Sequence, residues 1–212
     1  MSQGLILEQF DVLRSAYPEL NLRREGSVWF IEGVLNFSAQ YAGLPIDDNY
    51  SILVFLPDNY PDDIPIAFET TGRIPKDFHK LHIPNGALCL GEPIAVIRKF
   101  LKEPSLLGYI NNCLIPYLYS FSQKSRYGQI PFGELSHGSK GKVQHYLELF
   151  DLKDVHSLRG LIAVLAKENY RGHALCPCRS GKRVRSCHGA LLLELMKLKM
   201  SGYFMDLLND IS

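Results

Sequence analysis

Four potential metal ligands lie within thirteen positions near the C-terminal end of the sequence, and they constrain the local fold more strongly than any other feature. They are Cys176, Cys178, Cys187 and His188. Thiolates and imidazole are preferred zinc ligands, and four of them fill a closed tetrahedral site. Cys-x-Cys can bind one metal from a tight turn, Ser180-Gly181 can reverse the chain, and the adjacent Cys-His pair can complete the set. Because no position remains for water, we predict a structural zinc ion; the alternative is free thiols beside a basic segment.

The cysteine content and the apolar runs predict a cytoplasmic protein. The chain has five cysteines, an odd number, and three of them are in the cluster, which fits metal binding in a reducing compartment better than disulfides. The apolar run Leu5–Leu7 is followed at once by Glu8, so we expect no secretion signal. Later apolar runs are shorter than the roughly 18 residues that span a bilayer, so we expect no membrane partner.

Length and charge limit the organisation and the partners. With 212 residues and 46% hydrophobic content, the chain can form one medium domain plus a small appendage, and it is too apolar to be disordered as a whole. The net charge is +1, from 23 basic and 22 acidic residues. This balance argues against nucleic acid as a general partner and leaves the oligomeric state open.

The periodicity of apolar residues predicts an α+β fold. A helix over 4–17 precedes strands at 28–37, 50–56 and 66–70, which form an antiparallel β-meander. A rigid proline-rich loop joins the last two strands, and a long irregular segment over 73–92 follows. Helical spacing then recurs over 106–117, in a short segment that ends near 150, and over 158–165 and 191–200. We expect Pro116 to kink or shorten its helix.

Cys89 lies in the irregular segment over 73–92, together with His79 and His82. A cysteine in such a Gly/Pro-rich loop is more accessible than one on an apolar helical face, and a nearby imidazolium would lower its pKa. Cys113 lies on an apolar helical face, so we predict that it is a core residue. The local chemistry of Cys89 leaves two interpretations open, a reactive nucleophile and an ordinary buried cysteine.

The string CPCRSGKRVRSCHG at 176–189 closely resembles the SEC-C motif, a short zinc-binding module of the preprotein translocation ATPase and many other bacterial proteins. The resemblance implies that the four clustered residues are the zinc ligands and that the segment is a binding or docking module. Its basic side chains favour an acidic protein surface or nucleic acid as partner, or form only a solvated face. They are Arg179, Lys182, Arg183 and Arg185.

A second resemblance covers roughly residues 1–150. Tyr60-Pro61, Ile64–Thr70 and Phe78–Leu90 resemble the ubiquitin-conjugating (UBC) enzyme family in residue type, order and spacing. The resemblance implies a UBC-like domain over 1–150, with an N-terminal helix, an antiparallel meander, an active-site loop and C-terminal helices. Residues 151–212 then form a helical extension with the SEC-C motif. Cys89 matches the catalytic cysteine of that family.

One position departs from the family pattern. The family has His-Pro-Asn, whose asparagine stabilises the oxyanion, whereas this chain has His79, Lys80 and Leu81. Leucine cannot donate a hydrogen bond. We therefore predict that His82 takes over, as an oxyanion donor or as a general base toward the attacking amine. His79 matches a family histidine whose role is mainly structural.

A UBC-like domain followed by SEC-C is similar to the conjugating enzymes of short bacterial CBASS antiphage operons. The resemblance implies that Cys89 forms a thioester with the C-terminus of a cGAS-like nucleotidyltransferase and transfers it to an amine on a target protein. The sequence has no glycine-rich nucleotide-binding fingerprint, so activation comes from elsewhere or is unnecessary. The alternatives are a UBC-like binding scaffold without turnover and, less favoured, a cysteine peptidase that uses Cys89 and a histidine.

Overall fold

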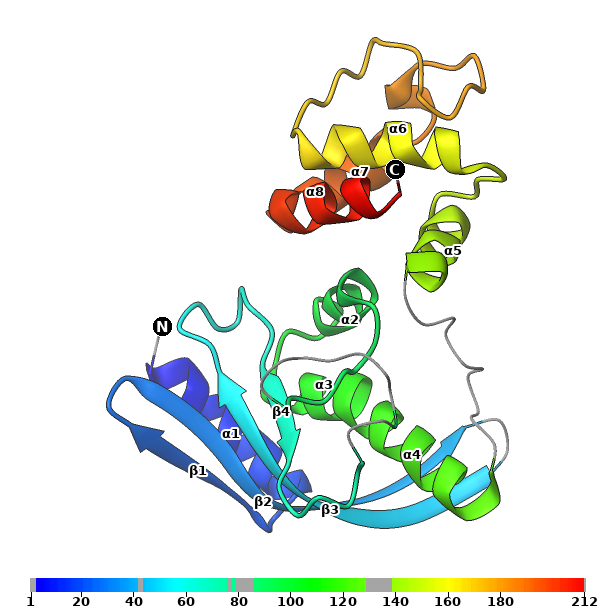
Figure 1. Cartoon of the computed structure of the whole chain (residues 1–212). Helices are drawn as coiled ribbons and strands as arrows, with labels where there is room; N and C mark the ends of the chain where they lie inside the picture. Colours follow the sequence, from blue (N-terminus) through cyan, green and yellow to red (C-terminus); the bar gives the residue numbers. More distant parts are fainter. Residues whose placement is uncertain (1–2, 42–43, 76–77, 79–85, 129–138, 212) are drawn as a thin grey trace. The chain divides into compact units, whose positions relative to one another are not determined.

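The computed structural model describes residues 3–41, 44–75, 78, 86–128 and 139–211, which fall into two compact units (Figure 1). The units are Met1–Glu134 and Leu135–Ser212. The first contains a sheet and helices α1 to α4, and the second contains helices α5 to α8. We expected the division at residue 150. The helix that ends at Leu149 instead groups with the C-terminal unit, because it packs against α6 of that unit.

A four-stranded antiparallel sheet forms the centre of the first unit, as an α+β fold requires. Its strands are β1 (Leu20–Glu25), β2 (Val28–Tyr41), β3 (Leu44–Leu56) and β4 (Ile66–Glu69). They pair in chain order β1-β2-β3-β4, which confirms the predicted meander and adds β1 to it. Gly33 permits this pairing, since a Cβ there would lie 2.2 Å from the carbonyl oxygen of Glu19.

One face of the sheet is buried under helices. Alternate residues of β3 are buried, among them Tyr50, Ile52 and Val54. Helix α1 (Gln3–Ala16) contributes Ile6, Phe10 and Leu13 to the same hydrophobic core. The predicted amphipathic helix over 4–17 is therefore confirmed, including its packing on the sheet.

The segment after the Cys89 region forms α2 (Pro93–Phe100), α3 (Leu106–Tyr109), a π-helical turn (Ile110–Leu114) and α4 (Ile115–Tyr127). Pro116 lies in the first turn of α4, where a missing N–H costs little. We predicted that Pro116 kinks or shortens a single helix. The structure instead has a π-helical turn directly before α4, and α4 begins at Ile115. Cys113 is 3% exposed in this turn, so its assignment to the core is confirmed.

The second unit is helical. Its elements are α5 (Ser139–Leu149), α6 (Val155–Ala166), a 3-10 turn (Val184–Ser186), α7 (Gly189–Met196) and α8 (Ser201–Asp210). Helix α6 packs against the other three helices, and Asp154 caps it by accepting a 2.8 Å hydrogen bond from the Ser157 amide. The helix predicted over 191–200 ends at Met196, and the chain turns through Lys199, with a φ of 52°, before α8 begins. None of the helices among the described residues is long and apolar enough to cross a lipid bilayer.

Candidate functional sites

The structure brings the four predicted metal ligands together in the second unit. The ligand atoms of Cys176, Cys178, Cys187 and His188 all lie within 4.8 Å of one another. The Sγ atoms of Cys176 and Cys187 are each 3.3 Å from His188 Nδ1, and the Sγ atoms of Cys178 and Cys187 are 3.4 Å apart. Tetrahedral zinc places neighbouring S and N ligands about 3.5 Å apart, whereas a disulfide needs about 2.05 Å. The cluster can therefore hold a metal ion such as zinc.

A short hairpin presents the first two cysteines. The Cys176 amide donates to the Lys182 carbonyl at 2.8 Å, and the Val184 amide donates to the Ala174 carbonyl at 2.9 Å. Between these bonds the chain reverses through Arg179, with a φ of 62°, and Gly181, with a φ of 75°. Positive φ angles suit glycine best, so the predicted reversal at Ser180-Gly181 has its physical cause in this turn.

A 3-10 turn and the start of α7 present the other two ligands. The Cys187 amide donates to the Val184 carbonyl at 3.0 Å, which folds the chain back toward the hairpin. A Cβ on Gly189 would lie 2.7 Å from the carbonyl oxygen of Val184, so only glycine permits this close approach. Cys187 and His188 are thereby placed opposite the hairpin.

Phe150 holds the imidazole of His188 from the far side. His188 Nε2 lies 2.8 Å from the Phe150 carbonyl oxygen, and the Phe150 ring packs edge-on against the imidazole. A carbonyl can only accept, so Nε2 carries the proton and Nδ1 keeps its lone pair toward the thiols. This is how metal-binding histidines are usually oriented. Sequence reasoning missed Phe150, because a backbone carbonyl leaves no trace in residue type.

The thiols of the cluster differ in acidity. Burial raises the pKa of Cys176 to about 11. Burial also opposes ionisation of Cys178, but its hydrogen bonds with the Ser180 side chain and backbone outweigh burial and lower the pKa of Cys178 to about 6. Metal ligation requires thiolates, and a divalent cation supplies the positive charge that stabilises several of them in a small volume.

The basic side chains predicted to favour a partner lie on or beside the metal-binding hairpin. Arg179, Lys182, Arg183 and Arg185 are all exposed. Leu175 is exposed too, at 72%, and pairs with Arg183 across the hairpin. The segment is therefore accessible, and the chemistry of its partner stays a prediction.

Cys89 lies in the first unit, half-buried, in a segment attached to the sheet. The Leu88 amide donates to the Ala67 carbonyl of β4 at 2.8 Å, and Cys89 Sγ lies 3.9 Å from the Gly91 carbonyl oxygen. Burial raises the pKa of the Cys89 thiol above its ordinary value. We expected a nearby imidazolium to lower it, but both predicted histidines, His79 and His82, lie outside the described residues.

Tyr117 of α4 interacts electrostatically with Cys89, a relation that the sequence did not indicate. Burial raises the pKa of Tyr117 above its usual range, and the negative charge of an ionised Cys89 raises it further. The Tyr117 ring packs edge-on against Phe78, with centroids 5.9 Å apart. Tyr117 was predicted only as one apolar residue on a helical face, so its interaction with the thiol had no separate signal.

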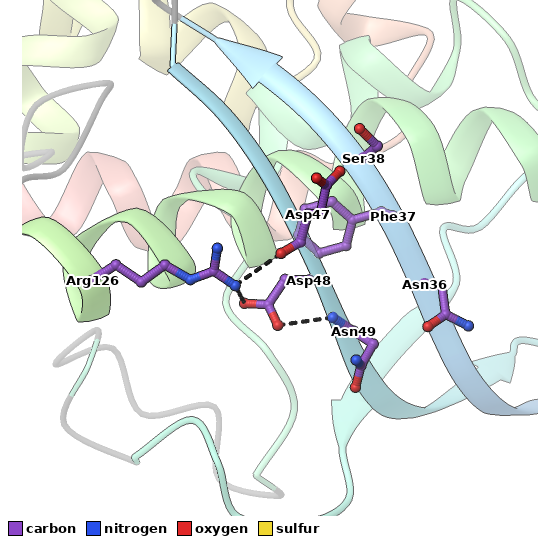
Figure 2. A pocket seen from close by; sticks show the side chains of 7 residues that line it. All are labelled: Asn36, Phe37, Ser38, Asp47, Asp48, Asn49 and Arg126. Atoms are coloured by element: carbon purple, nitrogen blue, oxygen red, sulfur yellow. Dashed lines mark hydrogen bonds and ion pairs between the residues drawn. The ribbon is translucent and has the colours of Figure 1, made fainter.

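A charged cluster in the same unit was also absent from the sequence predictions. Figure 2 shows an open pocket at one end of β2 and β3, lined by Asn36, Phe37, Ser38, Asp47, Asp48, Asn49 and Arg126. Burial alone would raise the pKa of Asp48, but hydrogen bonds from Arg73 and Ser122 outweigh burial and lower it to about 2. Asp48 is therefore an ionised carboxylate at neutral pH.

Comparisons with protein family models, curated proteins and solved structures returned no match to this chain. Function must therefore be argued from the two sites themselves. The C-terminal cluster has the donor set and spacing of a metal centre, and the N-terminal unit places one half-buried thiol between β4 and α2.

Proposed function

We propose that the N-terminal unit is a UBC-like conjugating domain that carries an acyl group on Cys89. The observation that supports this proposal is the position of the thiol in the element order. A helix, a four-stranded antiparallel meander, a half-buried cysteine on a segment attached to the last strand, and further helices follow one another along the chain. This is the order that the UBC resemblance implies. The proposed setting is a bacterial antiphage system of the CBASS type.

The proposed reaction has two steps. In the first, Cys89 Sγ attacks the activated C-terminal carbonyl of the cGAS-like nucleotidyltransferase, a C–S bond forms, and the activating group leaves with its electron pair. In the second, an amine on a target protein attacks the thioester, a C–N bond forms, and the Cys89 thiolate leaves and takes up the proton that the amine loses. The net product is an amide, and no redox change occurs.

The raised pKa of Cys89 places a demand on the first step. A thiol with a raised pKa is mostly protonated near neutral pH, so it needs a group that accepts its proton at the moment of attack. We propose His82 for the amine-transfer step, as oxyanion donor or general base, and a structural role for His79. The raised pKa is also the one observation that favours the second candidate, a UBC-like scaffold that binds without turnover.

We propose that the C-terminal unit is a SEC-C-like docking module built around one structural zinc ion. Cys176, Cys178, Cys187 and His188 would hold the ion, which supplies the folding energy that a hairpin of this size lacks. The exposed basic side chains beside it are the proposed contact surface for a protein partner. Docking would bring the acyl donor or the target protein to the conjugating unit.

A transfer assay tests the role of Cys89 without an activating enzyme. The candidate nucleotidyltransferase is supplied as a C-terminal mercaptoethanesulfonate thioester, and the zinc-loaded protein is analysed by intact-mass spectrometry. We expect a covalent adduct that thiol reductant removes, and an ester adduct that survives reductant in Cys89→Ser. Cys113→Ser is the matched control, since this thiol is buried, and it should behave like the wild type. An adduct that persists in Cys89→Ala would place the chemistry elsewhere.

Single-turnover discharge of the preformed thioester to an amine tests the roles of the histidines. We expect His82→Ala to slow discharge by roughly ten- to a thousand-fold, the range for loss of one acid–base or oxyanion group. Loading of Cys89 should be largely spared. His79→Ala should chiefly lower stability. Discharge at the wild-type rate in His82→Ala would refute its assignment and favour the scaffold.

A further inference from the structure

Asp48 interrupts an apolar row. Along β3 the even-numbered residues face the core, and Ile46, Tyr50 and Ile52 are each 1% exposed. Asp48 occupies the same row, and its side chain is only 6% exposed. A carboxylate in such a position is costly unless opposite charges and hydrogen-bond donors surround it. The groups that surround the Asp48 carboxylate must therefore stabilise its charge at this position.

The partners of Asp48 come from two other parts of the chain, the segment after β4 and helix α4. Arg73 donates to both carboxylate oxygens, at 2.8 Å each, and Arg126 of α4 donates to Oδ2 at 3.0 Å. Ser122, also on α4, donates to Oδ2 at 2.7 Å and lies 2.7 Å from the Tyr50 hydroxyl. The bonds from Arg73 form a fork-to-fork pair, the most directional of the ion pairs. Asp48 thus joins β3 both to α4 and to the segment after β4.

Arg73 is held in one orientation by further contacts. Its Nη1 also donates to the Asn49 carbonyl at 2.7 Å, and its guanidinium lies 4.2 Å from the centre of the Tyr50 ring. Glu69, at the end of β4, accepts hydrogen bonds from the amides of Thr71 and Ile74. The turn that leads from β4 to Arg73 is therefore fixed at both of its ends.

The chain from Arg73 leads to the surroundings of Cys89. Phe78 packs edge-on against Phe121 and Tyr117 of α4, with ring centroids 4.7 Å and 5.9 Å away. Tyr117 in turn is electrostatically coupled to Cys89. At the other end, the Leu88 amide is bonded to β4. Phe78 is thus attached to α4, and Leu88, the residue before Cys89, is attached to the sheet.

We propose that Asp48 and Arg73 are positioning residues for the chemistry at Cys89. Their ion pair fixes Arg73 against β3 and, through the shared carboxylate, against α4, so that Phe78 further along the chain stays packed on Tyr117. This inference rests on the proposed conjugating function for its catalytic part. Its structural part, the anchoring of the segment, can be measured without any acyl donor.

Arg126 supplies a matched control. Arg73 and Arg126 both pair with Asp48 Oδ2, and their side chains are 40% and 39% exposed, but only Arg73 belongs to the Cys89 segment. In Arg73→Ala we expect hydrogen exchange of the Phe78 amide to accelerate about tenfold, while the Leu88 amide is unchanged. Single-turnover discharge of the thioester should slow about tenfold, with loading largely retained. Arg126→Ala should change neither the Phe78 exchange rate nor the discharge rate by more than about twofold. Arg73→Lys should recover only part of the discharge rate, because lysine cannot form the two parallel hydrogen bonds of a guanidinium.

Each outcome decides a stated part of the proposal. Equal acceleration of Phe78 exchange in Arg73→Ala and Arg126→Ala would overturn the anchoring role. Faster exchange with wild-type discharge would overturn the positioning role. Absence of any Cys89 adduct on the wild type would refute the proposed function and the catalytic part of this inference, whereas the exchange measurement would still decide whether Arg73 anchors the segment.

Discussion

Replacing Gly160 by alanine tests how the hairpin that carries Cys176 and Cys178, two of the candidate metal ligands, is held in place. Gly160 lies inside α6, and a Cβ there would be 2.6 Å from Cβ of Pro177, the residue between two of the metal ligands. Real carbon atoms do not approach so closely. Pro177 is rigid and is flanked by Cys176 and Cys178, so the hairpin as a whole must move to make room.

The expected magnitude follows from two opposing effects. Inserting a methyl group into a packed contact costs about 1–3 kcal/mol, and replacing a helical glycine by alanine stabilises the helix by up to about 1 kcal/mol. Gly202 of α8 has no atom within 4 Å of its ideal Cβ position, so Gly202→Ala should show the second effect alone. Gly160→Ala should therefore be less stable than Gly202→Ala by about 1–3 kcal/mol. For a domain of this size each kcal/mol lowers Tm by about 4–8 °C.

Calorimetry of the zinc-loaded full-length proteins measures this difference. The transition of the C-terminal unit is identified as the one that moves to lower temperature when chelator is added. Zinc transfer to a coloured chelator gives a second measure, and Gly160→Ala should release zinc faster than Gly202→Ala because its ligands are displaced. Equal Tm values and equal release rates in the two variants would refute the packing of Pro177 on α6.

Two further predictions concern the metal and the charged cluster. Elemental analysis should find one zinc ion per chain in the wild type and none in the Cys187→Ala, His188→Ala double variant. A chelator should unfold the C-terminal unit and leave Met1–Glu134 folded. Less than half an equivalent of zinc in protein never exposed to chelator would contradict the site. Asp48 has a folded-state pKa of about 2 against an ordinary 3.8, so its contribution to stability is present above about pH 4 and is lost as the pH falls toward 2. Urea unfolding should show a loss on the order of 2 kcal/mol from this group over that range, and an unchanged pH dependence in Asp48→Asn would contradict the assignment.

The parts of the fold that the sequence predicted are those with a local signal. Strict alternation over Tyr50–Leu56 predicted β3, and the apolar spacing of 158–165 predicted α6, because each pattern records burial on one face. Strand β1 was missed, since its Arg and Glu residues are exposed or half-exposed and give little apolar alternation. The compact units divide before α5 and not near residue 150, because α5 packs on α6, a contact that periodicity does not record.

The same distinction applies to the candidate sites. The four candidate metal ligands are close in sequence, so their spacing alone predicted the cluster that the structure contains. Asp48 and Arg73 are 25 residues apart, and their partners on α4 lie about 50 residues further on. No local sequence pattern connects residues so far apart. A single aspartate in a strand cannot be distinguished, from sequence alone, from an ordinary exposed polar residue.

The thiols of this chain show how the same group acquires different chemistry from its surroundings. In the C-terminal cluster, three sulfur atoms lie close together with an imidazole lone pair, an arrangement that favours a cation because thiolates alone would repel one another. Cys89 is half-buried and has a raised pKa, and its Sγ lies 3.9 Å from the Gly91 carbonyl oxygen. A protonated thiol is a poor metal ligand and is protected from unwanted oxidation. Cys176 has a raised pKa as well, so a bound cation, and not its resting acidity, would make it a thiolate. Under the proposed function, Cys89 would in the same way lose its proton only when an acyl donor arrives.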